Sequence, residues 1–181
     1  MSATLTEPKA AQKDVKAPAD GAAQGERTAA GNLSQIVSFR LANEEYGVDI
    51  MRVQEIILLG QITKMPEVPS YICGLINLRG HVIPIVDLRK RFGLSSHENN
   101  EHTRIIVVNV ANKTIGMIVD AVDEVLRVNP NQIEPPPSSV AGIDHRYITG
   151  LVKLEDKLLI LLSVENLLSD EDKSRLAVNN G

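Results

Sequence analysis

The residue types that most often carry catalysis are few in this chain, and their spacing matches no catalytic pattern. Cys73 is the single cysteine, which excludes an internal disulfide and a zinc site built on several cysteines. The four histidines, His81, His97, His102 and His145, stand in turns or linkers and form no HxH, HxxE or HExxH pattern. We therefore interpret Cys73 as a packing residue and the histidines as solvated loop residues.

The acidic residues give no better case for an enzyme. Asp120, Asp123 and Glu124 cluster in the sequence, but nothing beside them indicates a paired general acid and base. The chain also lacks the G-x-S-x-G elbow, the P-loop and the G-x-G-x-x-G turn. We read the three carboxylates as a charged strand face, and we expect neither catalytic activity nor a metal or cofactor.

Binding is the remaining kind of chemistry, and Arg79 is its strongest candidate. Arg79 stands between two apolar runs and is followed by Gly80, which predicts the tip of a hairpin. A polar turn residue is the simpler interpretation. The alternative is an interface anchor, because a planar guanidinium pairs in two ways with carboxylates or carbonyls. The basic residues 89–91 are explained by solubility or by the same interface.

The elements that would hold Arg79 belong to an internal sequence repeat. YICGL (71–75) returns as YITGL (147–151), 76 residues further on, and residues 39–57 are echoed by residues 108–126 at an offset of 69. Such self-similarity indicates a small β unit that was duplicated. NLRG (77–80) stands where the second copy has KLED. Because the two copies share a fold, this difference indicates that the NLRG residues serve something other than the fold.

The duplication also pairs two apolar stripes. Val53, Glu55 and Ile56 of the first copy correspond to Val122, Glu124 and Val125 of the second. One interpretation is a shared core stripe with one exposed acid. The other is a groove where the two copies meet, which could accept an amphipathic helix from a partner.

Composition restricts the class of protein further. The chain has 181 residues, 43% hydrophobic and 3% aromatic, with a net charge of −4. An acidic, ring-poor chain is atypical of nucleic-acid-binding modules. The N-terminus has no apolar signal region, and the longest apolar run, 158–162, is far shorter than the roughly 20 residues that span a bilayer. These features predict a cytoplasmic protein.

The pattern along the chain predicts an all-β fold. Residues 1–33 are expected to form a disordered tail, followed by a domain at 34–168. Within it, subdomains at about 35–94 and 103–168 are intertwined and joined by the linker 95–102, and residues 169–181 form a fraying C-terminal tail. Alternating apolar residues between turn signals predict short hairpins, and two copies predict two small barrels.

A few local features are predicted with more detail. Residues 74–78 and 82–86 form a hairpin, in which Pro84 indicates an edge position or a bulge. Asp87 caps a short helix at 88–92. Residues 53–58 are ambiguous between a helix and a strand.

Four motifs together closely resemble the CheW family of chemotaxis coupling proteins. They are VQEII (53–57), GLINLRGHVIPIVDLR (74–89), IGMIVDAVDEVL (115–126) and YITGL (147–151). The resemblance runs from about residue 35 to residue 168.

The resemblance implies two similar, SH3-like, five-stranded β-barrels packed around a shared hydrophobic core. It implies a non-catalytic, cofactor-free adaptor that joins methyl-accepting chemotaxis receptors to the regulatory domain of the histidine kinase CheA. The adaptor would act in the cytoplasm, at receptor arrays on the inner face of the membrane. By motif, the implied partner-binding residues are Arg79, Gly80, Val53, Glu55, Gly74, Val122 and Val125.

Alternatives stay open at this point. The same module occurs within CheA and in CheV, but the chain has no room for a kinase core, and the residues after Leu168 are too few for a receiver domain. We therefore expect a stand-alone coupling protein. A CheW-like scaffold of a twitching or gliding pathway is the second hypothesis, and a small nucleic-acid-binding β-barrel is the third.

Overall fold

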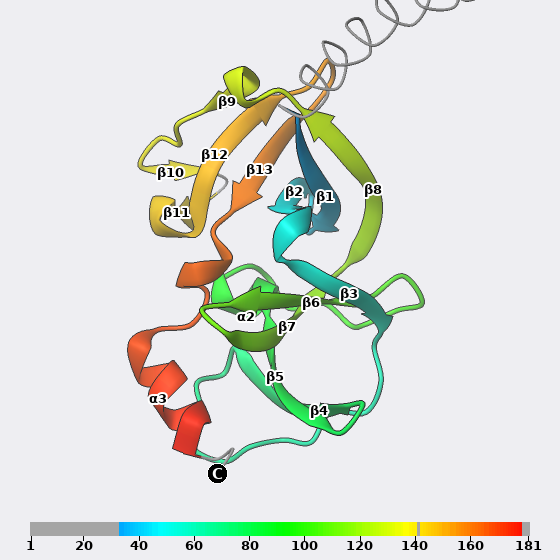
Figure 1. Cartoon of the computed structure of the whole chain (residues 1–181), viewed down its shortest axis with the longest axis vertical. Coiled ribbons are helices and arrows are strands. Elements are labelled where there is room, and N and C mark those ends of the chain that lie inside the picture. Colours follow the sequence, from blue (N-terminus) through cyan, green and yellow to red (C-terminus); the bar gives the residue numbers. More distant parts are fainter. Residues whose placement is uncertain (1–32, 141, 179–181) are drawn as a thin grey trace, which may run out of the picture. The chain divides into compact units, whose positions relative to one another are not determined.

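The computed structural model describes residues 33–140 and 142–178. The chain divides into two units at Gln35, and apart from Ser34, which begins the first strand, the sheets and sites discussed lie in the second, Gln35–Gly181. The predicted disordered tail falls, apart from Leu33, outside the described residues. Figure 1 shows that strands dominate the second unit and that its helices are short.

Two sheets make up most of the fold. The six-stranded sheet has the strand order β8 (Ala121–Val128), β1 (Ser34–Leu41), β2 (Glu44–Asp49), β13 (Leu158–Leu162), β12 (Ile148–Lys153) and β9 (Ile133–Glu134). The five-stranded sheet has the order β3 (Val53–Leu58), β6 (Arg104–Val110), β7 (Lys113–Val119), β5 (His81–Asp87) and β4 (Ile72–Leu78). The mostly-β prediction is therefore confirmed.

Short elements connect these strands. A third, two-stranded sheet pairs β10 (Ser139–Val140) with β11 (Ile143–Asp144). The α-helices of the described residues are α2 (Leu88–Arg91) and α3 (Asp170–Val178). The 3₁₀ turns are η1 (Ile50–Arg52), η2 (Pro130–Gln132), η3 (His145–Tyr147) and η4 (Val164–Asn166).

The prediction of two closed five-stranded barrels is correct in strand number for one sheet only, and neither sheet is a closed barrel in the described residues. One sheet has six strands, because the short β9 pairs with the outer edge of β12. Within the described residues, the first and last strands of each sheet do not pair with each other. On the outer edge of β4, an isolated bridge between Thr63 and Leu75 takes the place of a closing strand.

The two halves of the sequence exchange their first hairpins. The early hairpin of β1 and β2 lies in the sheet that otherwise consists of late strands, between β8 and β13. Conversely, β6 and β7 lie between β3 and β5. In Figure 1 the blue β1 accordingly runs beside the yellow-green β8, and the green β6 runs beside the cyan β3.

Strand registers repeat at the offsets seen in the sequence. In the five-stranded sheet, Ile85 pairs with Gly116 in the parallel ladder of β5 and β7. In the six-stranded sheet, Leu161 pairs with Gly47 in the parallel ladder of β13 and β2. Both glycines permit close approach, because a Cβ on Gly47 would lie 2.4 Å from Ile36 and one on Gly116 would lie 2.6 Å from Ile85. The two sheets therefore follow one structural plan.

The core has one large cluster between the sheets and a smaller one within each. The large cluster combines residues of the six-stranded sheet, such as Phe39 and Tyr46, with Val86 and Ile106 of the five-stranded sheet. The other face of each sheet buries its own aliphatic cluster, around Leu159 in the six-stranded sheet and around Ile105 in the five-stranded sheet. Alternate strand residues thus face different clusters, which explains the period of two in the sequence.

Several local predictions can now be compared with the structure. Residues 53–58 form a strand, β3. Asp87 caps α2, since its side chain accepts a hydrogen bond from the Lys90 N–H. Pro84 lies in an interior strand, not at an edge, and the bulge of the hairpin falls at Ile72 and Gly74. Pro84 is tolerated because the pairing of β5 with β7 begins only at Ile85.

The prediction that the chain frays after Ser169 is wrong for residues 170–178, which form α3. Ser169 and Asp172 cap this helix reciprocally: the Asp172 side chain accepts from the Ser169 N–H, and the Ser169 side chain accepts from the Asp172 N–H. Leu176 is buried against the large cluster. A capped helix with one buried leucine was missed because its other positions are largely charged.

Candidate partner-binding site

The turn between β4 and β5 holds Arg79 in a conformation that is unusual for arginine. Leu78 pairs with His81, so Arg79 and Gly80 alone close the hairpin. Their φ angles are 54° and 86°, as a two-residue turn with a type I′ twist requires. Asn77 supports the turn by accepting a hydrogen bond of 2.8 Å from the Gly80 N–H. The predicted hairpin tip is therefore confirmed, and the positive φ is ordinary for Gly80 but not for Arg79.

Arg79 forms a two-pronged ion pair with Glu55. The Arg79 Nη1 and Nη2 atoms each lie 2.9 Å from a carboxylate oxygen of Glu55. The Arg79 side chain is 73% exposed, whereas that of Glu55 is 18% exposed. Glu55 lies on β3, the first strand of the sheet, and the turn follows β4, the last strand. The pair therefore links the two edges of the five-stranded sheet at one end.

A hollow of about 380 Å³ adjoins the ion pair. Glu55 and Arg79 line it together with Ile83 and Thr114. Apolar side chains stand exposed on the same elements, namely Ile56 and Leu58 on β3 and Val82 on β5. Because Ile56 and Leu58 alternate with Glu55 along β3, they lie on the face opposite to the ion pair. A charged pair at the rim of a hollow is an arrangement found in protein interfaces.

The other predicted site residues do not all gather here. Val53 is partly buried against the large core cluster, as is Val122. Val125 is 51% exposed, and it lies with Val122 on β8 of the six-stranded sheet. The structure thus brings Glu55 and Arg79 together, while Val122 and Val125 belong to another sheet.

Gly74 has a clear structural reason to be glycine. Its φ is +145°, and a Cβ there would lie 2.0 Å from the Thr63 carbonyl oxygen. The close approach allows Leu75 and Thr63 to exchange two main-chain hydrogen bonds of 2.8 Å. Gly80 differs, because a Cβ there would meet nothing within 4 Å.

Of the basic residues 89–91, only Lys90 is exposed as the solubility interpretation expects. Arg89 is only 14% exposed and forms an ion pair with Asp120, and Arg91 stacks on the Tyr71 and Tyr147 rings. Burial acts to raise the pKa of Asp120, but hydrogen bonds from Arg89 and the Ala42 N–H outweigh it and lower that pKa. Arg89 and Arg91 therefore stabilise the fold through contacts with residues distant in sequence, which the local sequence pattern does not show.

The groups that could do catalysis are arranged as ordinary structural residues. Burial raises the pKa of the half-buried Cys73 thiol, which disfavours the nucleophilic thiolate at neutral pH. Across residues 33–140 and 142–178, no three His, Cys, Asp or Glu side chains gather in a way that could hold a metal ion. Asp123, one of the clustered carboxylates, forms an ion pair of 3.2 Å with Arg40, which is an ordinary structural contact.

Two packed sheets that display a charged turn define a protein-binding β scaffold. Residues 35–172 match the family model described as the CheW-like domain. The chemotaxis protein CheW of Klebsiella aerogenes is 41% identical over 138 residues, covering 76% of this chain and 83% of that protein. That of Bacillus subtilis is 35% identical over 144 residues, covering 80% and 92%.

A solved structure gives the same result. The scaffolding protein TtCheW from Thermoanaerobacter tengcongensis superposes with a TM-score of 0.72 at 44% identity, covering 76% of this chain and 88% of that one. The chain belongs to the CheW family of chemotaxis scaffold proteins. It is accordingly a non-catalytic adaptor. In the part of the chain that the structure describes, no helix has both the length and the apolar character needed to cross a membrane.

Proposed function

We propose that this scaffold joins methyl-accepting chemotaxis receptors to the histidine kinase CheA, at receptor arrays on the inner face of the membrane. Membership of the CheW family supports this assignment. Coupling requires that the scaffold bind two receptor states with different affinity, because equal affinity would leave the kinase unchanged. The partner-binding residues are Arg79, Gly80, Val53, Glu55, Gly74, Val122 and Val125.

The observation that carries the proposal is the strained presentation of Arg79. A non-glycine residue in the left-handed region costs about 1–2 kcal/mol, and asparagine or glycine would fit this turn better. The fold gains little in return, because an ion pair with a 73% exposed arginine is worth at most about 1 kcal/mol. Arg79 is therefore retained for contact with a partner, and Glu55 holds its guanidinium in the orientation for docking.

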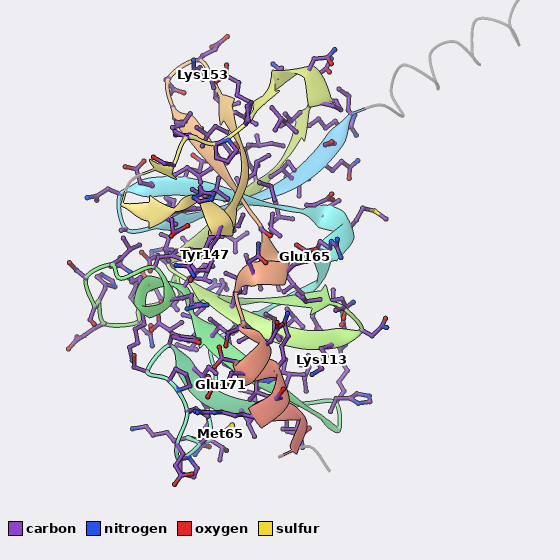
Figure 2. The ribbon with its side chains drawn as sticks, turned by 90° about the vertical axis from the view of Figure 1, so that its left-hand side faces the viewer. Met65, Lys113, Tyr147, Lys153, Glu165 and Glu171 are labelled. Atoms are coloured by element: carbon purple, nitrogen blue, oxygen red, sulfur yellow. The ribbon has the colours of Figure 1, made fainter. Side chains whose placement is uncertain are left out.

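Receptor-stimulated kinase activity in a reconstituted mixture of receptor, kinase and scaffold tests this role. Arg79→Glu is expected to abolish stimulation while circular dichroism shows an intact fold. Lys153→Glu is the matched control, because Lys153 is 74% exposed and lies at the far end of the six-stranded sheet (Figure 2). Full stimulation by a folded Arg79→Glu protein would contradict the proposal that Arg79 contacts a partner.

Exchanging the two charges distinguishes a role of Arg79 in partner binding from a role in holding the hairpin. The double variant Arg79→Glu with Glu55→Arg preserves an ion pair, but the exposed residue at position 79 now carries a negative charge. If Arg79 contacts a partner, the double variant stays inactive. If the pair serves only to hold the hairpin, the double variant regains stimulation, and the proposal for Arg79 fails.

A further inference from the structure

All five aromatic residues of the chain belong to one continuous row. Ring centroids are 5.9 Å apart for Phe39 and Tyr46, 6.3 Å for Tyr46 and Phe92, and 5.3 Å for Phe92 and Tyr147. The fifth ring, Tyr71, joins the row through a guanidinium. A chain with so few rings has concentrated them where its two sheets meet.

Arg91 closes the gap in this row. Its guanidinium carbon lies 4.3 Å from the Tyr71 ring centroid and 4.9 Å from that of Tyr147, so it is held by cation–π contacts on both sides. Its Nε donates a hydrogen bond of 2.7 Å to the Leu167 carbonyl. We call these four residues, Arg91, Tyr71, Tyr147 and Leu167, the Arg91 clamp.

The clamp joins positions that the duplication relates. Tyr71 and Tyr147 are 76 residues apart, as are Arg91 and Leu167. Tyr71 leads into β4 of the five-stranded sheet, and Tyr147 ends η3, which leads into β12 of the six-stranded sheet. Figure 2 shows Tyr147 where the yellow and orange elements of one sheet approach the green elements of the other. One guanidinium thus bridges two equivalent rings from different sheets.

Helix α3 fixes the outer ring of the clamp. The Tyr71 hydroxyl donates to the carboxylate of Asp172, which is 3% exposed. Burial, with a smaller contribution from that hydrogen bond, raises the pKa of Tyr71 to about 12, so the hydroxyl remains a donor at neutral pH. Arg175 and Lys113 attach the helix further, through hydrogen bonds that involve the Glu67 and Lys173 carbonyls.

We propose that the Arg91 clamp is the joint that sets the orientation of one sheet against the other, and that α3 locks it through Asp172. No strand pair connects the two sheets in the described residues. The chain passes from one sheet to the other at Asp120 and at η1, so side-chain packing has to set the angle about these two short connections. A rotation between the sheets would separate the guanidinium from one of its two rings. Arg91 is in this sense a positioning residue, distinct from the residues that contact partners.

The distance between spin labels on the two sheets measures the joint directly in the full chain. Labels are placed at two exposed strand positions, Leu58 on β3 and Lys153 on β12, through cysteine substitution in a Cys73→Ala background. Arg91→Lys keeps the charge but loses the planar group, and it is expected to at least double the width of the distance distribution. Arg104→Lys is the control, because the Arg104 Nη1 also donates to main-chain carbonyls, and it should keep the parent width.

A second variant keeps the test decisive if Arg91→Lys does not fold. Tyr71→Phe retains every ring and removes only the hydrogen bond to Asp172, so an intermediate width is expected. A folded Arg91→Lys protein with the parent width would overturn the proposal. Should Arg91→Lys not fold, the parent width in Tyr71→Phe would overturn it instead.

The consequence for signalling rests on the proposed function. In the reconstituted mixture, Arg91→Lys is expected to bind receptor and kinase within twofold of the unmodified affinity but to lower stimulation at least threefold, because the sheets no longer move together. An unchanged stimulation would show that the joint does not transmit signals. The distance measurement needs no partner, so failure of the proposed function would leave the structural result intact.

Discussion

The hairpins β4–β5 and β12–β13 are equivalent by the duplication, yet they end differently. Both carry a bulge at the same place, at Gly74 in one and Gly150 in the other. The first closes with two residues of positive φ. The second closes with residues 154–157, held by a hydrogen bond of 2.8 Å from the Leu154 N–H to the Lys157 carbonyl. Since one plan accepts both turns, the fold does not require Arg79.

The two turns also differ in charge. The first exposes Arg79, whereas the second exposes Glu155 and Asp156. The tips of the two equivalent turns therefore carry opposite charges, and two lysines, Lys153 and Lys157, flank the acidic tip. A scaffold that must hold two different partners benefits from such a difference, because like charges opposite each other reject the wrong partner.

The largest expected effect concerns the two bulge glycines. Gly74→Ala is expected to lower the free energy of unfolding by about 3 kcal/mol, through an unfavourable φ and a clash with main chain. Gly150→Ala is expected to cost less, about 1 kcal/mol, because Gly150 has no positive φ and its nearest contact, at 2.5 Å, is the Ile133 side chain on the two-residue edge strand β9, which can shift as a whole. Urea denaturation measures both values, and equal losses would show that the two bulges are not differently constrained.

The next effect concerns the two turns themselves. Arg79→Glu is expected to weaken binding of one partner by about 2 kcal/mol, which is roughly thirtyfold. Glu155→Arg, at the equivalent position, is expected to leave that affinity within about twofold. Titration calorimetry with receptor fragment and with kinase gives both numbers. A comparable loss from Glu155→Arg would mean that charge alone, and not the first turn, governs docking.

A smaller effect concerns two ion pairs, each of which contains one of the repeat mates Arg89 and Glu165. Arg89 pairs with Asp120, and its repeat mate Glu165 pairs with Arg52 in a more exposed setting. Asp120→Asn is expected to destabilise the fold by about 1 kcal/mol and Glu165→Gln by less. Urea midpoints at neutral pH test this order.

The pH dependence of that pair follows from the lowered pKa of Asp120. A lowered folded-state pKa stabilises the fold fully above the ordinary carboxyl value of 3.8, and this stabilisation is lost as pH falls through the folded-state value. The difference in stability between the unmodified protein and Asp120→Asn should therefore shrink below about pH 4. A difference that grows in acid would contradict the assigned direction.

The smallest effect is conformational strain alone. Gly80→Ala meets no atom but must adopt a φ of +86°, so a loss of about 1 kcal/mol is expected. Gly60→Ala is the control, because Gly60 has similar space and no positive φ. No residue of 153–157 in the second turn has a positive φ, so Asp156→Ala should likewise cost little. Thermal unfolding of the three variants decides the matter.

Much of the fold could be predicted because local patterns determine it. The β4–β5 hairpin, the Asp87 cap and the turn at Gly80 follow from short-range preferences. The strand β3 was ambiguous because, as an edge strand, it exposes Ile56 and Leu58 and so obscures its alternation. The two residues of β9 are too short to leave any pattern.

The candidate site could be predicted only in part, for a similar reason. Arg79 and Glu55 were each identified by motif, but their pairing depends on how the sheet brings β3 near the last hairpin. The roles of Arg89 and Arg91 also depend on distant partners, Asp120 and two tyrosines. Contacts between residues far apart in sequence leave no periodic signal in a single chain.

The central claim is that this chain, without catalysing a reaction, holds a receptor and a kinase at once. Co-sedimentation of CheA with receptor-containing membranes tests it most directly. Kinase is predicted to sediment with the membranes when the unmodified protein is present, and to remain in the supernatant without it or with Arg79→Glu. Sedimentation of the kinase that is the same with and without the protein would contradict the account.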